Sequence, residues 1–114
     1  MTVRRYKDQI LVTVENGIAN IKLGPMVGGN RIDLSVATAF QSACDSLMSD
    51  PSLRVVLVSA GGTDFCNGGI RVEDACENFD KYRVASALSK IKQPVIAALH
   101  GKVIDQGLEL ALAA

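Results

Sequence analysis

The chain has 114 residues, of which 48% are hydrophobic and 21% charged, as is ordinary for one globular domain. Twelve basic residues balance twelve acidic ones, which disfavours proteins that grip nucleic acid or an anionic membrane through a positive surface. We expect a single domain over residues 1–114 with one hydrophobic core. The only local excess of charge, Arg4, Arg5 and Lys7, is interpreted as a solvated lead into a first strand.

A β-hairpin is predicted near the N-terminus. Residues Gln9–Glu15 alternate with valine and isoleucine, Asn16-Gly17 supplies a two-residue turn that tolerates positive φ, and Ile18–Leu23 alternates again. The next stretch, GPMVGGNRI from Gly24 to Ile32, holds four glycine or proline residues. It should therefore be an exposed loop.

A helix should follow this loop, with Asp33 or Ser35 as its cap and its end at Asp50-Pro51. Its apolar positions recur every three or four residues and are Leu34, Ala37, Phe40, Cys44 and Leu47. The continuous run RVVLVSA, residues 54–60, then predicts a strand that is buried on both faces of a parallel sheet.

The second half of the chain continues this alternation. After the loop GGTDFCNGGI, residues 61–70, an amphipathic stretch over residues 72–92 predicts a helix that stops before Pro94. VIAAL, residues 95–99, predicts another buried strand, and residues 107–114 favour a helix. The order ββαβαβα indicates an α/β fold whose late strands pair in parallel through a right-handed crossover.

Two loops of this fold are suited to ligand binding, because ligands lie beyond the carboxyl ends of parallel strands. They are Gly61–Ile70 and Gly101–Gly107, which should lie side by side. A backbone N–H from each loop could form an oxyanion hole for a thioester or ester carbonyl. The alternative for the first loop is a tight surface turn. A nucleotide-phosphate loop is disfavoured, since no GxGxxG or GxxxxGK spacing is present.

Glu109 is the one polar side chain among the last eight residues, in a helix that is otherwise leucine, alanine and glycine. Its carboxylate either faces water along a narrow edge or is buried, where it could pass protons near neutral pH. Cys66 could be a nucleophile only with His100 as its base, and a small buried thiol is favoured instead. His100 is expected to pack or to cap a strand end.

The three cysteines, Cys44, Cys66 and Cys76, are an odd number without a C-x-x-C pair. This disfavours a disulfide framework and a zinc site, so no metal is expected. The N-terminus has charges without an apolar segment behind them, and no apolar run approaches the length of a membrane span. We therefore expect a protein of a reducing setting, cytoplasmic or in an organelle matrix, with no membrane partner.

Three segments carry a family resemblance. VVLVSAGGTDFCNGG is similar to a hydrophobic strand followed by G-x-x-x-F-x-x-G-x-D-L, and KQPVIAALHGKVIDQGLELALAA is similar to K-P-V-I-A-A-V-x-G-x-A-x-G-G-G-x-E-L-A-L-A. NRIDLSVATAFQSA matches an N-A-L loop and its following helix. In this order and at these separations, the motifs resemble the N-terminal half of the crotonase superfamily, the enoyl-CoA hydratase/isomerase family.

The resemblance implies a crotonase-like spiral of ββα units with parallel strands, truncated before the C-terminal helices. It also implies an acyl-CoA thioester as substrate, no cofactor beyond the coenzyme A of the substrate, and a homo-oligomer, either a trimer or a hexamer. By motif position, Gly69 and Gln106 supply the two N–H donors of an oxyanion hole, and Glu109 is the first acid of the hydratase pair. The implied substrate-binding residues are Arg31, Ile32, Phe65, Cys66, Asn67, Gly68 and Ile70.

Three departures from the family pattern bear on activity. Ile70-Arg71 stands where the family has an aspartate and an apolar residue, which alters the adenine-side contacts. Asp105-Gln106 replaces Gly-Gly at the second donor, where a Cβ narrows the approach and would be strained if the backbone needs positive φ. The family also continues beyond the equivalent of Ala114, with the second hydratase carboxylate and part of the acyl pocket.

Two functions from different classes therefore compete. One is a hydratase or isomerase that acts on acyl-CoA thioesters. The other is a catalytically inactive crotonase-like module that binds acyl-CoA or serves in oligomerisation. If these 114 residues are the whole chain, the apolar last helix should expose surface that a second copy, another chain or a swapped element covers.

Overall fold

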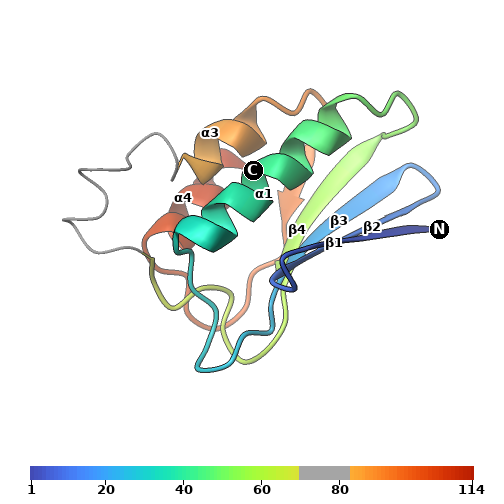
Figure 1. Cartoon of the computed structure of the whole chain (residues 1–114). Helices are drawn as coiled ribbons and strands as arrows, with labels where there is room; N and C mark the ends of the chain where they lie inside the picture. The colour runs from blue at the N-terminus through green and yellow to red at the C-terminus, as the bar shows by residue number, and fades with distance from the viewer. Residues whose placement is uncertain (70–82) are drawn as a thin grey trace.

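The computed structural model describes residues 1–69 and 83–114. Its strands form one sheet in the order β1-β2-β3-β4-β5, and the helices lie on one side of it (Figure 1). The elements are β1 (Thr2–Tyr6), β2 (Ile10–Glu15), β3 (Ile18–Leu23), α1 (Leu34–Met48), β4 (Val55–Ala60), α3 (Val84–Ser89), β5 (Val95–Ala97) and α4 (Gln106–Ala113). Apolar side chains of the sheet and helices pack between these two layers.

The predicted hairpin is confirmed. Strands β2 and β3 pair antiparallel, and Glu15 opposite Ile18 is the last pair before the turn. Asn16 and Gly17 both have positive φ, 53° and 79°, which is the geometry that a tight two-residue hairpin turn requires. The side chain of Arg54 donates a hydrogen bond of 2.6 Å to the carbonyl of Asn16, so the turn is also held from β4.

Arg4 and Arg5 are exposed, as the N-terminal prediction has it, but they lie within a strand and not ahead of the first one, so that part of the prediction is wrong. They belong to β1, which pairs antiparallel with β2 from Thr2 opposite Val14 onward. Four of the five residues of β1 are exposed. The strand therefore lacks the alternation of buried and exposed residues from which a strand is predicted. Charged side chains on an edge strand also discourage pairing with another chain.

Helix α1 begins and ends close to the predicted positions. Of the two candidate caps, Asp33 is the one that bonds: its carboxylate accepts a hydrogen bond of 2.9 Å from the backbone N–H of Val36. Ser35 instead donates to the Gln9 side chain. Cys44 is fully buried on the sheet-facing side of the helix, and burial raises the pKa of its thiol to about 12, so the thiol stays protonated.

Strands β4 and β5 pair in parallel, as predicted, and β3 also pairs in parallel with β4. Burial of β4 and β5 on both faces is wrong for the described chain. Val56 and Val58 are fully buried, whereas Leu57 between them is only partly covered. Ile96, its partner on β5, is 52% exposed. The cause is that the described helices cover one face of the sheet, which leaves the alternate side chains on the other face partly in water.

Of the helix predicted over residues 72–92, the structure describes only the last part. Its Val84–Ser89 portion is α3, which packs against both α1 and α4, while residues 72–82 lie outside the described part of the chain. Helix α4 is present as predicted and begins one residue earlier, at Gln106. Within residues 1–69 and 83–114, no helix is long and apolar enough to span a membrane.

The loops that follow β3, β4 and β5 gather at one end of the sheet, because these strands run in the same direction (Figure 1). A single carboxamide joins the first two loops. The side chain of Asn30, which is 2% exposed, donates to the carbonyls of Gly61 at 2.7 Å and Asp64 at 3.0 Å. It also accepts a hydrogen bond of 3.0 Å from the N–H of Met26. Asn30 therefore sets the position of one loop relative to the other.

Replacing Asn30 with Ala should lower the free energy of unfolding by about 3 kcal/mol, because several backbone groups would lose their partners while still shielded from water. Urea titration followed by circular dichroism measures this. The control is Asn67→Ala, which removes an exposed carboxamide from the neighbouring loop and should change stability by less than about 0.5 kcal/mol. Equal urea midpoints for the two variants would contradict the role given to Asn30.

Candidate active site

The loop after β4 and the loop after β5 lie side by side, as the strand order predicts. Cys66 and Val103 form a parallel bridge that continues the β4–β5 pairing beyond the ends of the two strands. The N–H of Cys66 donates to the carbonyl of Lys102 at 2.9 Å, and the N–H of Ile104 donates to the carbonyl of Cys66 at 3.1 Å. These bonds fix the start of α4 against the glycine-rich loop.

His100 stabilises this junction and does not serve Cys66 as a base. Its Nε2 lies 2.9 Å from the carbonyl of Gly62, and its own carbonyl accepts a hydrogen bond of 2.8 Å from the N–H of Phe65. The Cys66 thiol is buried and donates to the carbonyl of Gly68 at 3.0 Å. Burial raises the pKa of this thiol, so a thiolate nucleophile is disfavoured.

The two residues expected to supply oxyanion-hole donors are neighbours in space. Gln106 is the first residue of α4, and its carboxamide lies directly against Gly69. A Cβ at Gly69 would overlap the Oε1 atom of Gln106 and would lie 3.3 Å from Nε2. The N–H groups in the first turn of a helix have no partner within the helix, so that of Gln106 is suited to an external acceptor.

The backbone of Asp105 has positive φ, which is the condition under which the sequence analysis expects strain at this position. Its φ is 54° and its ψ is −122°, a conformation that glycine adopts at little cost and a residue with a Cβ adopts at about 1–3 kcal/mol. Its Oδ2 would lie 3.3 Å from a Cβ at Gly68. The side chains of Asp105 and Gln106 therefore occupy space that Gly68 and Gly69 leave free.

The Glu109 side chain is exposed, so the described chain has the first of the two arrangements expected for it, the one that faces water. Glu109 lies three residues after Gln106 on α4, and such residues project from the same face of a helix. A negative side chain in the first turn also interacts favourably with the helix dipole. Glu109 is thus near the loop junction and open to solvent.

The candidate substrate-binding residues divide by burial. The buried ones form the floor of the junction and are Ile32, Phe65, Cys66 and Gly68. Arg31 and Asn67 are exposed and leave their side chains available to a ligand, and Ile70 lies outside the described residues. The N–H of Ile32 donates to the carbonyl of Gly68 at 3.2 Å, so the first loop is fastened here as well.

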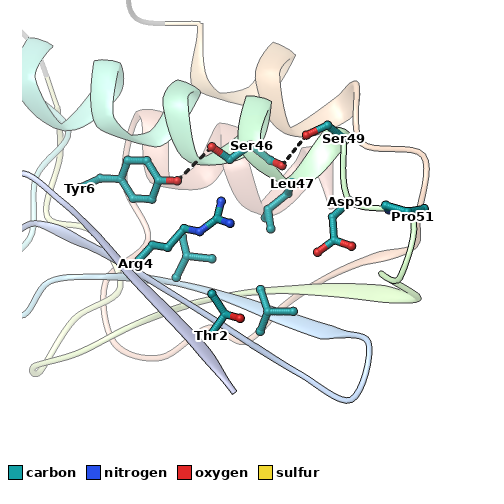
Figure 2. Close-up of a pocket in the computed structure, with 10 residues that line it drawn as sticks. Thr2, Arg4, Tyr6, Ser46, Leu47, Ser49, Asp50 and Pro51 are labelled. Atoms are coloured by element: carbon teal, nitrogen blue, oxygen red, sulfur yellow. Dashed lines mark hydrogen bonds between the residues drawn. The ribbon is translucent and has the colours of Figure 1, made fainter.

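A hollow of about 230 Å³ adjoins these loops, between Pro25, Met26, Gly29 and Asn30 on one side and Gly61–Asp64 on the other. A larger hollow of about 360 Å³ lies elsewhere, between β1, β2 and the end of α1, and shares no residue with the candidate site (Figure 2). Arg4 projects into it, and the hydroxyl of Tyr6 lies 3.1 Å from that of Ser46. No sequence motif predicted this second hollow.

Comparison with known proteins identifies the family. The sequence profile described as enoyl-CoA hydratase/isomerase matches residues 13–114. The chain belongs to the enoyl-CoA hydratase/isomerase family. Among curated proteins, it is 30% identical over 115 residues to a Mycobacterium tuberculosis protein named probable enoyl-CoA hydratase. It is 27% identical over 118 residues to the trans-2-decenoyl-[acyl-carrier-protein] isomerase of Streptococcus mutans.

The fold of this family member is also that of crotonases. The crystal structure of an enoyl-CoA hydratase/carnithine racemase from Magnetospirillum magneticum matches it with a TM-score of 0.85 and 27% sequence identity. The match covers 94% of this chain and 44% of that one. The Mycobacterium and Streptococcus relatives are covered to 45% each, against 94% and 93% of this chain. The chain therefore spans slightly less than half the length of these relatives, consistent with the predicted resemblance to an N-terminal half.

Replacing Asp105 with Gly should raise the free energy of unfolding by about 1 kcal/mol, because glycine removes the strain at positive φ and loses part of that gain to chain entropy. The side chain of Asp105 makes no capping hydrogen bond to α4 that would be lost. Asp105→Ala is the matched control, since it removes the carboxylate and keeps a Cβ. Thermal unfolding should rank the glycine variant above the alanine variant, and the reverse order would show that the backbone at this residue is not strained.

Proposed function

We propose that this chain is the CoA-facing part of a hydratase or isomerase that acts on acyl-CoA thioesters. In this proposal, the N–H groups of Gly69 and Gln106 donate to the thioester oxygen, and Glu109 transfers protons. The observation that carries it is the contact of Gly69 with Gln106 at the carboxyl ends of parallel strands, with Glu109 one turn along α4, in a member of this family.

The proposed chemistry depends on charge that develops at the thioester oxygen. When a base removes a proton next to the carbonyl, or water adds to the conjugated double bond, this oxygen becomes an enolate oxygen. Two N–H groups fixed by the backbone stabilise that charge without first reorganising, and loss of one such donor typically slows turnover by about 10²–10³-fold. The loop bonds of Cys66 with Lys102 and Ile104 would keep the donors in place.

The names of two relatives support the proposed substrate class: one is a probable enoyl-CoA hydratase, and the other is a trans-2-decenoyl-[acyl-carrier-protein] isomerase. Coenzyme A would enter as part of the substrate, with no further cofactor. Arg31 and Asn67 are exposed beside the junction and are the side chains best placed to contact its polar groups. The second acid of a hydratase pair falls, by the family resemblance, in the part of the relatives that this chain does not span. A cytoplasmic location stays a prediction from the sequence.

A catalytically inactive acyl-CoA-binding module is the second candidate. Two observations favour it: the Glu109 carboxylate faces water, and the Gln106 carboxamide occupies the space against Gly69. Both candidates require that acyl-CoA binds at the same junction. They differ in whether a carboxylate there moves protons.

Turnover of crotonyl-CoA separates the two candidates. Glu109→Gln should lower turnover by at least about 10²-fold, the contribution of a positioned acid or base, while the affinity for coenzyme A changes less than about twofold. Steady-state kinetics and calorimetric titration measure the two quantities. Glu15→Gln, which neutralises an exposed carboxylate at the end of the hairpin, should leave both unchanged. A wild-type protein that binds coenzyme A without turning over substrate would establish the inactive module.

We further propose a homo-oligomer, a trimer or a hexamer, in which a second copy covers the outer side of α4. Leu108 and Leu112 lie one turn apart on this helix and are 47% and 77% exposed. Apolar surface gains about 25 cal/mol for each Å² removed from water, so this stripe favours association. Leu112→Gln should shift the mass measured by light scattering toward that of one chain, whereas Val27→Gln, at an isolated loop residue, should not. A single-chain mass for the wild type at all concentrations would exclude this proposal.

A further inference from the structure

The hollow between β1, β2 and the end of α1 has no part in the proposed function, and it contains an arginine where an apolar side chain is expected (Figure 2). Thr2, Arg4 and Tyr6 alternate along β1, so their side chains share the face of this strand that is turned toward α1. Arg4 stands opposite Val12 of β2, which is 2% exposed. Buried valine, isoleucine, leucine and alanine fill the same layer in β2, β3 and β4.

The hollow holds two opposite charges that do not bond each other. Arg4 forms no hydrogen bond with the other residues that line it (Figure 2). Asp50 lines the same hollow, and its carboxylate accepts hydrogen bonds from the N–H of Ser52 at 2.9 Å and from the Ser52 hydroxyl at 2.6 Å. These bonds, and to a smaller extent the charge of Arg4, hold the pKa of the Asp50 carboxyl below its usual range. Asp50 is therefore ionised at neutral pH.

These two charges restrict the ligands that the hollow can bind. An anion attracted to Arg4 is repelled by Asp50 and by the partial negative charge at the C-terminal end of α1. A cation attracted to Asp50 is repelled by Arg4. A molecule that has both a carboxylate and an ammonium group meets an opposite charge for each of them. Val12, Val14 and Leu47 also line the hollow and offer apolar surface to a hydrocarbon group.

We propose that this hollow binds a free amino acid with an apolar side chain, whose carboxylate pairs with Arg4 and whose ammonium group pairs with Asp50. The Ser46 hydroxyl accepts a hydrogen bond of 3.1 Å from Tyr6, which leaves its own proton to be donated to the carboxylate. The volume of about 360 Å³ lies at the lower end of the range for small-molecule sites. Arg4 is exposed, so the hollow is open to such a ligand. The inference does not depend on the proposed function.

Three ligands with related carbon skeletons test the inference by calorimetric titration of the wild-type chain at neutral pH and low salt. They are L-leucine, isocaproate, which lacks the ammonium group, and isoamylamine, which lacks the carboxylate. Leucine should bind at least about tenfold more tightly than either analogue, because each analogue loses one charge-assisted hydrogen bond and keeps one repulsion. This comparison needs no variant, so it decides the matter even if a substitution prevents folding.

Single-charge variants should change the preference in opposite directions. Arg4→Gln should weaken leucine binding at least about tenfold and strengthen the binding of isoamylamine, which Arg4 repels. Asp50→Asn keeps an oxygen for Ser52 to bond, and it should weaken leucine binding and strengthen that of isocaproate. Arg5→Gln is the matched control, since the exposed Arg5 projects from the opposite face of β1. It should change the leucine affinity by less than about twofold.

Four other results would overturn the inference. If isocaproate binds the wild type as tightly as leucine, the hollow is a site for carboxylates alone, and equal binding of isoamylamine makes it a site for amines. A loss of leucine binding in Arg5→Gln equal to that in Arg4→Gln would show attraction to the charged surface in general. If none of the three ligands binds, the inward-pointing Arg4 serves only to discourage pairing of the edge strand with another chain.

Discussion

The parallel pairing of β4 with β5, continued by the bridge between Cys66 and Val103, is the constraint on which the candidate site depends. It brings two loops that are far apart in the sequence into one backbone hydrogen-bond network and sets where α4 begins. Gly107 permits the close approach, since a Cβ there would overlap the side chain of Cys66. Asn30 adds the loop after β3 to the same network through its buried carboxamide. The backbone around Gly69 and Gln106 is therefore fixed by contacts among the loops that follow β3, β4 and β5.

Most of the fold could be predicted because its signals are local. Asn16-Gly17 fixes a hairpin through the positive φ that the turn requires, and Asp33 followed by apolar residues at helical spacing fixes α1. The errors lie where burial depends on distant parts of the chain. Strand β1 is an exposed edge whose residues do not alternate, and Ile96 is apolar by sequence yet exposed, because the described helices cover only the other face of the sheet.

The candidate site was predictable as a place but not as an arrangement of side chains. Strand order alone puts Gly61–Ile70 beside Gly101–Gly107, since parallel strands end at the same edge. Nothing in the sequence indicates that Asn30 bonds two loops, or that the Gln106 oxygen lies against Gly69 without a donor. Such facts depend on rotamers and on contacts between residues distant in sequence, for which no local pattern exists. The roles of Gly69, Gln106 and Glu109 in chemistry stay proposals.

The Asp105-Gln106 pair concentrates two unfavourable features in one turn of backbone: a residue with a Cβ at positive φ and a buried oxygen without a donor. Strain of this kind persists only where the surrounding structure imposes it. Here the Cys66–Ile104 hydrogen bond and the packing of Gly107 on Cys66 impose it from either side. The backbone strain is fixed, because neither contact can relax without breaking the bridge between the loops.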